Sequence, residues 1–397
     1  MSDAISERLR LLTDSVTMAI TARAAELRAS GVPVIGFAAG EPDFATPEHV
    51  VAAATAALAD PRNLRYGPAS GMPSLREAVA VTTTAETGFA VTPDQVVITV
   101  GAKGAVFGGM AAVLEPGDEV LLPSPYWVTY PEAASLFGAV VRYVPAGPAD
   151  GFKVTPERLE AARTPRTKML VFCSPNNPTG AVYAPDEVRA IGRWAAHHGI
   201  WVLSDDIYRG LTYGDARFES MAVLAPEVTE RFIVVDGPAK SFAMTGWRVG
   251  WMIGPTQVAA GVGRLQAHST SNVATVLQIG AEAAITGPRD TVDVMRAAFD
   301  RRRKRMVELV AAIPGVTCLE PDGAFYTFPS VDGLFGRRIG THVPTTSTEL
   351  AAALLEEAQI AVIPGEAFGA PGYLRLSFAL SDEDLEEGLD RWRSVVG

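Results

Sequence analysis

Lys240 is the residue whose surroundings most clearly indicate covalent chemistry. It lies in the stretch FIVVDGPAKSFAMTGWRVGW, just after an apolar run, and Arg248 follows it eight residues later. Nearby cations and an apolar environment lower the pKa of a lysine, and an amine with a lowered pKa can form a Schiff base with an aldehyde. Taken alone, Lys240 would more often be interpreted as a solvated lysine of a surface loop, because most lysines are exposed.

Other polar and aromatic candidates also follow short apolar runs. Asp205 and Tyr208 lie in SDDIY, Asn177 in SPNNPTG and Trp127 in SPYW. A buried carboxylate needs a partner, such as a protonated heterocyclic nitrogen, or its pKa rises. Asn177 could supply amide hydrogen bonds or simply form a turn. Trp127 could stack on a planar ring or pack in the core.

A glycine-rich segment, GAKGAVFGG, follows the apolar run at 96–100. Gly101 would permit a tight turn into a helix, and the amides of Ala102 and Lys103 would then lie at the positive end of that helix, where a phosphate can bind. A turn without a ligand is the alternative. The segment matches neither the dinucleotide fingerprint nor the P-loop.

These candidates are positioned by strands that alternate with helices. Seven apolar runs are expected to be strands: 96–100, 119–123, 140–144, 169–173, 200–204, 232–236 and 249–253. Helical patterns between most of them predict an α/β fold with a mostly parallel sheet. The last two runs are joined by the Lys240 loop without a crossover helix, so that pair should be antiparallel. Ligands of such sheets bind at the carboxyl ends of the strands.

The chain length predicts two domains, because 397 residues exceed the size at which a single core keeps growing. We expect a large domain over residues 45–289. Short strand signals in VTCLE, AFYTFPS, IAVIP and YLRLSFA predict a smaller α+β domain, formed by residues 1–44 and 290–397.

The composition excludes several classes of function. A formal charge of −11 disfavours a nucleic-acid partner, and no apolar run is long enough to span a membrane. The basic run Arg301–Arg305 is expected to be a solvated helix face. Cys173 and Cys318 are expected to fill core space in a reducing compartment. With no apolar signal region after MSDAISERLR, a cytoplasmic location is expected, and no metal site is expected.

As a set, AGEPDF, RYGPASG, SPYW, SPNNPTG, SDDIY, AKSFAMTGWRVG and YLRLSFA resemble the class I aminotransferases of the fold-type I pyridoxal-phosphate enzymes, most closely the bacterial aspartate aminotransferases. The resemblance runs from Ser15 to Trp392. It implies a mostly parallel seven-stranded sheet in a large domain plus a smaller α+β domain. It also implies pyridoxal 5′-phosphate as cofactor, with Lys240 forming the Schiff base and then moving a proton at the substrate Cα.

The resemblance also implies roles around the cofactor ring. Asp205 would pair with the ring nitrogen, and opposite charges about 4 Å apart gain roughly 4 kcal/mol at an effective dielectric near 20. Asn177 and Tyr208 would bond the ring's phenolic oxygen, and Trp127 would stack on the ring. The protonated ring would act as the electron sink of the reaction.

At the other end of the cofactor, the resemblance implies that Arg248, the turn at Gly101 and the amides of Ala102 and Lys103 hold the phosphate. Tyr66, in RYGPASG, matches a tyrosine that family members insert into the phosphate site of the neighbouring subunit. A homodimer with shared active sites is therefore implied.

For the substrate, the resemblance implies that Arg375 and the backbone of Gly40 clamp the α-carboxylate, with Trp127 and Asn177 beside it. Ser15, Thr17 and Lys103 resemble the polar set that meets a distal carboxylate in this subgroup, although Lys103 also lies close to the phosphate. Closure of the small domain would assemble the site.

This sequence departs from the family pattern beside the lysine and after Asp205. Gly237 and Ala239 stand where some relatives have hydroxyl residues, and Asp206 replaces the more usual glutamate. The phosphate site is therefore expected to have fewer side-chain donors.

The resemblance implies a ping-pong transfer of an amino group from L-aspartate, or a related amino acid, to 2-oxoglutarate. Alternatives are an aminotransferase for aromatic, prephenate-like or pathway-specific amino acids, or a β-lyase with the same cofactor. A ligand-sensing regulator built on this fold would need an added DNA-binding domain, and the aminotransferase pattern begins within the first 20 residues.

Overall fold

A seven-stranded sheet organises the larger part of the chain. The computed structural model describes residues 5–14 and 16–396. In spatial order the strands are β2 (Val96–Val100), β8 (Val249–Ile253), β7 (Phe232–Asp236), β6 (Trp201–Asp205), β5 (Thr167–Cys173), β3 (Glu119–Ser124) and β4 (Val140–Pro145). Each begins and ends within two residues of its predicted run.

All of these strands are parallel except β8, which is antiparallel to both of its neighbours. Val235 of β7 faces Met252, and Ile98 of β2 faces Trp251. The predicted mostly parallel sheet and the antiparallel pair around the Lys240 loop are therefore confirmed. A short connection without a helix can join antiparallel strands, whereas a parallel pair needs a longer crossover.

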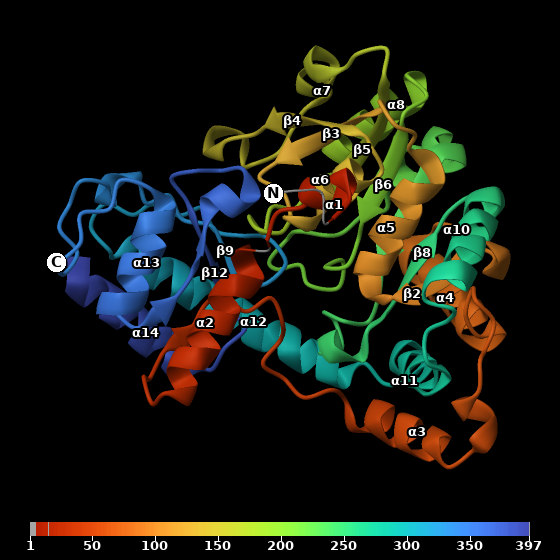
Figure 1. Ribbon diagram of the computed structural model, residues 1–397, viewed down its shortest axis with the longest axis horizontal. Coiled ribbons are helices and arrows are strands. Elements are labelled where there is room, and N and C mark those ends of the chain that lie inside the picture. Colours follow the sequence, from red (N-terminus) through yellow and green to blue (C-terminus); the bar gives the residue numbers. More distant parts are fainter. Residues whose placement is uncertain (1–4, 15, 397) are drawn as a thin grey trace.

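Helices cover both faces of this sheet (Figure 1). Along the strands, successive side chains point to opposite faces, so Leu121 and Val202 join one buried cluster while Val120 and Leu203 join the other. The helices are α1 (Glu7–Arg10), α2 (Val16–Ala29), α3 (Glu48–Leu58), α4 (Pro73–Thr87), α5 (Gly101–Val113), α6 (Thr129–Leu136), α7 (Pro156–Ala162), α8 (Pro185–His197), α9 (Met221–Leu224), α10 (Thr256–Ser269), α11 (Thr275–Thr286), α12 (Asp290–Ala311), α13 (Ser347–Glu357) and α14 (Asp382–Val396).

A second group of elements surrounds its own buried cluster, beside the large sheet in Figure 1. Its three-stranded sheet has the order β11 (Ile363–Pro364), β12 (Leu374–Ser377) and β9 (Tyr326–Thr327), all antiparallel. In a separate pair, β1 (Ile35–Gly36) runs parallel to β10 (Ile360–Ala361), which brings the N-terminal segment to the C-terminal one.

The predicted strand VTCLE is wrong. In that segment the structure has an isolated bridge from Thr317 to Ser330, and Leu319 is 46% exposed. Cys318 is only partly buried, although it packs against the neighbouring cluster. Without a continuous ladder, β-branched composition alone does not make a strand.

The prediction of a solvated face for Arg301–Arg305 is wrong at two of its five positions. Arg302 is 9% exposed and pairs with Asp43 and Asp382, at 2.9 and 2.8 Å. Arg303 is 4% exposed and pairs with Asp300, at 2.7 Å. Each buried guanidinium therefore has a carboxylate partner, as burial of a charge requires.

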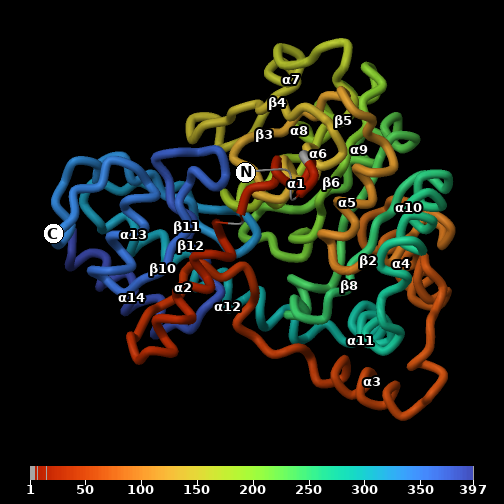
Figure 2. The backbone as a smooth tube through the Cα atoms, viewed as in Figure 1, coloured from red at the N-terminus to blue at the C-terminus, as the bar shows by residue number. Residues whose placement is uncertain are grey.

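The first described residues lie beside α6, as Figure 2 shows. There Thr13 donates from Oγ1 to Glu132 Oε1, at 2.7 Å, and from its amide to the other carboxylate oxygen, at 3.0 Å. Among the helices of the described residues, none combines the length and hydrophobicity that crossing a lipid bilayer requires.

Candidate active site

Three of the candidate segments meet at the carboxyl ends of the parallel strands. Asp205 is the last residue of β6, Asn177 follows β5, and Lys240 lies in the loop from β7 to β8. Side chains from the smaller group of elements reach the same place, because Arg375 of β12 donates from Nη1 to Asn177 Oδ1, at 3.0 Å.

Lys240 has the environment of a reactive amine. Its Nζ donates to the carbonyl oxygen of Gly40 at 2.5 Å and lies 5.9 Å from the ring centre of Tyr208 and 5.7 Å from that of Phe325. Burial, which disfavours the ammonium form, and then the charge of Arg375 lower the pKa of Lys240 to about 8. About a tenth of the amine is thus uncharged at neutral pH, far more than for an ordinary lysine.

Asp205 is a buried carboxylate with two hydrogen-bond donors. Its Oδ2 accepts from the hydroxyl of Tyr130 at 2.6 Å, and its Oδ1 accepts from the amide of Ile207 at 3.2 Å. Burial raises the pKa of Asp205 to about 6, and the hydrogen bond from Tyr130 opposes that shift. A cation beside this carboxylate would stabilise its charged form.

Tyr130 was not identified from the sequence, although it stands in SPYWVTY, three residues after Trp127. Its ring packs edge-on against Trp127, with centroids 5.3 Å apart. The ammonium of Lys103 lies 5.3 Å from the Trp127 centroid on the indole ring. Desolvation and then the charge of Arg248 lower the pKa of Lys103, although its side chain remains exposed.

Tyr326 is a second residue that the sequence did not reveal. Its hydroxyl lies 2.9 Å from that of Tyr208, and the guanidinium carbon of Arg375 lies 4.4 Å from its ring centre. The short run AFYTFPS predicted only a strand there. Tyr326 therefore contacts both Tyr208, which follows β6 of the large sheet, and Arg375 of β12.

Arg375 is 3% exposed and only partly satisfied by the protein. Its Nη2 donates to the carbonyl of Ala38 at 2.9 Å, in addition to the bond from Nη1 to Asn177. Within the part of the chain that the structure describes, its Nε has no acceptor. A buried, positively charged donor of this kind fits a carboxylate ligand.

The turn after β2 brings an arginine to a helix start. Gly101 has φ of +67°, and its amide donates to the carbonyl of Arg248 at 3.0 Å. A Cβ at position 101 would lie 2.6 Å from Nη2 of Arg248, and one on Gly250 would lie 2.4 Å from the amide nitrogen of Ala102. These glycines let a guanidinium lie beside the amides that begin α5, a combination that fits a phosphate.

Asp206, which follows Asp205, is buried in a different setting. Its Oδ1 accepts from the hydroxyl of Ser204 at 2.6 Å. Burial raises the pKa of Asp206 to about 8, and the nearby Asp236 carboxylate also contributes. Asp206 is therefore largely protonated at neutral pH.

The remaining predicted site residues are Thr17, Ser15 and Tyr66. Thr17 is in the first turn of α2, where its carbonyl accepts from the hydroxyl of Thr21. Ser15 lies outside the described residues. Tyr66 is 91% exposed and lines a groove. Among the described residues, no group of His, Cys, Asp and Glu could hold a metal ion.

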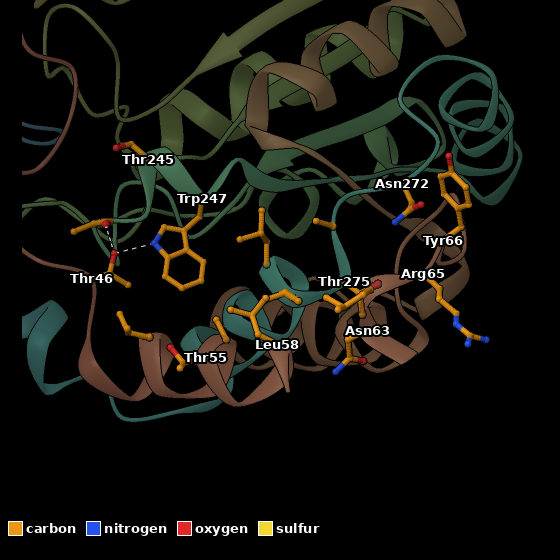
Figure 3. A pocket seen from close by; sticks show the side chains of 18 of the residues that line it. Thr46, Thr55, Leu58, Asn63, Arg65, Tyr66, Thr245, Trp247, Asn272 and Thr275 are labelled. Atoms are coloured by element: carbon orange, nitrogen blue, oxygen red, sulfur yellow. Dashed lines mark hydrogen bonds between the residues drawn. The ribbon is translucent and has the colours of Figure 1, made fainter. Parts of the chain in front are cut away.

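The groove beside Tyr66 has a volume of about 1520 Å³ and runs between α3, α11 and the end of the Lys240 loop (Figure 3). Trp247, whose indole nitrogen donates to Thr46 Oγ1 at 3.0 Å, lies on one side of it. Exposed apolar residues line the groove: Val51, Leu58 and Leu64 are 44, 56 and 62% exposed. Exposed apolar side chains that gather on one surface can mark an interface.

Comparisons with known proteins agree with this geometry. Residues 32–391 match the family model described as aminotransferase class I and II. The chain is 53% identical to an aspartate aminotransferase of Streptomyces avermitilis, over 99% of this chain and 96% of the relative. It is 44% identical to a probable aspartate/prephenate aminotransferase of Aquifex aeolicus, over 100% and 99%. The solved aspartate aminotransferase of Rhizobium meliloti is 36% identical, with a TM-score of 0.95 over 100% of this chain and 99% of that one.

Proposed function

This chain belongs to the class I and II aminotransferases, and we propose that it moves the amino group of L-aspartate to 2-oxoglutarate in a ping-pong cycle. It is an aminotransferase with the mostly parallel α/β fold of that family. The name of the Streptomyces relative supports aspartate as donor. The observation that carries the proposal is the Lys240 amine, held on the Gly40 carbonyl near the Arg375 guanidinium.

The residues present fit pyridoxal 5′-phosphate. Gly101 leaves the space in which the Arg248 guanidinium lies beside a helix start, which suits the phosphate. Asp205, buried with its charge only partly compensated, suits the ring nitrogen. Asn177 and Tyr208 would bond the ring oxygen, as the family resemblance implies. When bound, the cofactor supplies an aldehyde and an electron sink.

The chain's own groups would then orient the substrate and move its proton. Arg375, with its unpaired Nε, would bind the α-carboxylate together with the backbone of Gly40. That placement would hold the substrate Cα–H bond near Lys240, whose uncharged amine can take the proton from Cα. Lys103, Ser15 and Thr17 remain our candidates for the distal carboxylate, and Trp127 for ring stacking.

We also propose a homodimer with shared active sites. The apolar groove begins at Glu41 and Thr245, next to the Gly40 and Lys240 segments, and extends to Tyr66. With 91% of its surface exposed, Tyr66 is free to reach a neighbouring copy. We propose a cytoplasmic location as well, with which the two free cysteines are compatible. We also propose that residues 45–289 form the large domain and that residues 1–44 and 290–397 together form the small domain.

A single half-reaction tests the proposed donor. The cofactor-loaded protein is mixed with L-aspartate alone, and we expect one equivalent of oxaloacetate per site, followed by recovery of the starting form when 2-oxoglutarate is added. Lys240→Ala is the control and should retain the fold but not turn over. Pyruvate and ammonia from aspartate would instead indicate a β-lyase.

A second candidate, for the amino acceptor, comes from the Aquifex relative, whose name includes prephenate. In the same assay, prephenate and aromatic oxo acids replace 2-oxoglutarate as acceptors. A kcat/KM for prephenate equal to or above that for 2-oxoglutarate would favour the second candidate over the aspartate/2-oxoglutarate pair.

A further inference from the structure

An ion-pair network, buried at Asp236 and more exposed at Glu86 and Arg289, lies next to the segment that carries Lys240. Arg209, with 19% of its side chain exposed, places Nε 2.7 Å from Asp236 Oδ2 and Nη1 2.5 Å from Glu86 Oε2. Glu86 pairs in turn with Arg289. Two guanidinium groups thus share two carboxylates.

The network holds the beginning of the Lys240 segment. Asp236 ends β7, and its Oδ1 accepts from the amide of Gly237 at 2.7 Å, while its other oxygen is occupied by Arg209. Gly237 packs closely, because a Cβ there would lie 2.9 Å from the Cα of Gly250. The first residue of the segment is therefore fixed by one carboxylate and by close backbone packing.

The network also reaches the end of the same segment. The guanidinium carbon of Arg289 lies 5.7 Å from the ring centre of Phe242, and the amide of Phe242 donates to the carbonyl of Pro238 at 3.0 Å. A small cavity of about 30 Å³ lies among Glu86, Arg209, Asp236, Gly237, Phe242 and Arg289. Glu86 pairs with both Arg209 and Arg289, so the contacts at Gly237 and at Phe242, the two ends of the turn that carries Lys240, belong to one ion-pair network.

Arg209 connects this turn to a second segment of the site. It directly follows Tyr208, and its amide donates to the carbonyl of Asp206 at 2.8 Å. The amide of Asp206 donates in turn to the carbonyl of Val235 in β7, at 2.9 Å. A shift of the Arg209 side chain would therefore move groups on both sides of the site.

The geometry requires an arginine. Burial alone would lower the pKa of Arg209, but Asp236 and Glu86 together raise it. A planar guanidinium can bond two carboxylates from two nitrogens at once, whereas a lysine ammonium is a single point of charge. Replacing the guanidinium would leave the buried carboxylate of Asp236 without its partner.

We propose that Glu86, Arg209 and Asp236 form a clamp that positions residues 237–242 and, through them, the amine of Lys240. This inference rests on the proposed function, because it gives Lys240 its task. The three residues act as positioning residues and do not touch the reacting atoms.

The test uses Arg209→Lys, with Asp236→Asn as a second variant that keeps an acceptor for Gly237. In the cofactor-loaded protein, we expect kcat to fall on the order of tenfold while the KM for aspartate changes little, since loss of positioning acts on the reacting geometry. In the cofactor-free protein, the pH midpoint for acylation of Lys240 should differ from that of the unsubstituted protein, measured by mass spectrometry against Lys153 in the same sample. Amide exchange in 237–242 should become faster.

The matched control is Arg142→Lys. Arg142 also pairs with a buried carboxylate, bonding that of Glu119 through two nitrogens at 2.6 and 2.9 Å. Glu119 is the first residue of β3, however, so this pair lies at the amino ends of the parallel strands, whereas Asp236 is the last residue of β7. This variant should lose stability without changing kcat or the acylation of Lys240.

Unchanged kcat and Lys240 acylation in both clamp variants, or the same changes in the control, would overturn the clamp. If Arg209→Lys does not fold, Asp236→Asn decides by the same two readouts. Failure of the wild-type protein to aminate 2-oxoglutarate with aspartate would contradict the proposed function, whereas an active wild-type protein with unaffected variants would contradict the clamp alone.

Discussion

Asp205 and Asp206 are neighbours in the chain, yet their carboxyls lie in different environments. Asp205 receives hydrogen bonds from Tyr130 and the amide of Ile207, which favour its charged form. Asp206 has Ser204 as donor and lies near the Asp236 carboxylate. Burial nevertheless raises the pKa of both carboxyls, to about 6 for Asp205 and to about 8 for Asp206. One residue can hold a charge for a cation while the next stays neutral.

This difference predicts how stability depends on pH. An ordinary aspartate in the unfolded chain has a pKa of 3.8, while Asp206 in the folded protein has a pKa of about 8. Between these values the folded state binds the extra proton, so the stability contributed by this group falls as pH rises, by up to about 1.4 kcal/mol per pH unit. Asp206→Asn removes that proton uptake. Urea unfolding of the cofactor-free protein should show a smaller loss of stability from pH 5 to pH 8 in the variant, and equal losses would contradict the assignment.

At the scale of elements, the turn from β2 into α5 decides whether a phosphate can be held. Gly101→Ala would introduce a Cβ 2.6 Å from the Arg248 guanidinium at a φ of +67°. We expect the affinity for pyridoxal 5′-phosphate to fall roughly tenfold or more, because the arginine must move away from the helix start. Equilibrium titration of the cofactor-free protein measures it.

Gly117→Ala is the matched control, with φ of +91° and no atom within 4 Å of its Cβ. It should lose about 1 kcal/mol of stability through backbone strain and leave cofactor affinity unchanged. Equal affinity losses in both variants would show that strain, and not the displaced guanidinium, causes the effect at Gly101.

Most of the large sheet could be predicted because its inner strands are buried on both faces and therefore form continuous apolar runs, whereas the edge strand β4 is largely exposed. The smaller group of elements could not be predicted as well, because strands of two residues, such as β9, depend on partners far away in the chain. The same reason hid Tyr326, whose hydroxyl meets that of Tyr208 across 118 residues. Helical periodicity likewise could not show that Arg302 and Arg303 face covered surfaces.

For the site, the sequence indicated the segments but not how they contact each other. The motifs placed Lys240, Asp205, Asn177 and Arg375, and the structure brings the last two within hydrogen-bond distance. The bond from Tyr130 to Asp205 spans 75 residues, and no spacing rule within one element predicts such a pair.

At the scale of the whole molecule, the groove predicts an assembly. Leu58 is 56% exposed in α3 and lines the groove, so a glutamate there would bury a charge in the proposed dimer interface. Leu58→Glu should shift the protein toward monomer and lower activity, because Tyr66 would no longer reach the neighbouring site. Sedimentation equilibrium, with activity measured at the same concentrations, tests this.

Val294→Glu is the control, since Val294 is 63% exposed in α12 and does not line the groove. It should remain a dimer with full activity. A wild-type protein that is monomeric at all concentrations would contradict the dimer.

The place of β2 in the sheet constrains the order of events during synthesis. Among the described strands, β2 is hydrogen-bonded to β8 alone, and about 150 residues separate the two. A growing chain has therefore translated β3 to β7 before the partner of β2 emerges. Until Arg248 has been translated, Gly101 has no guanidinium beside it. We therefore expect a ribosome-bound fragment that ends between Lys240 and Arg248 to bind pyridoxal 5′-phosphate weakly, even though it already contains Lys240.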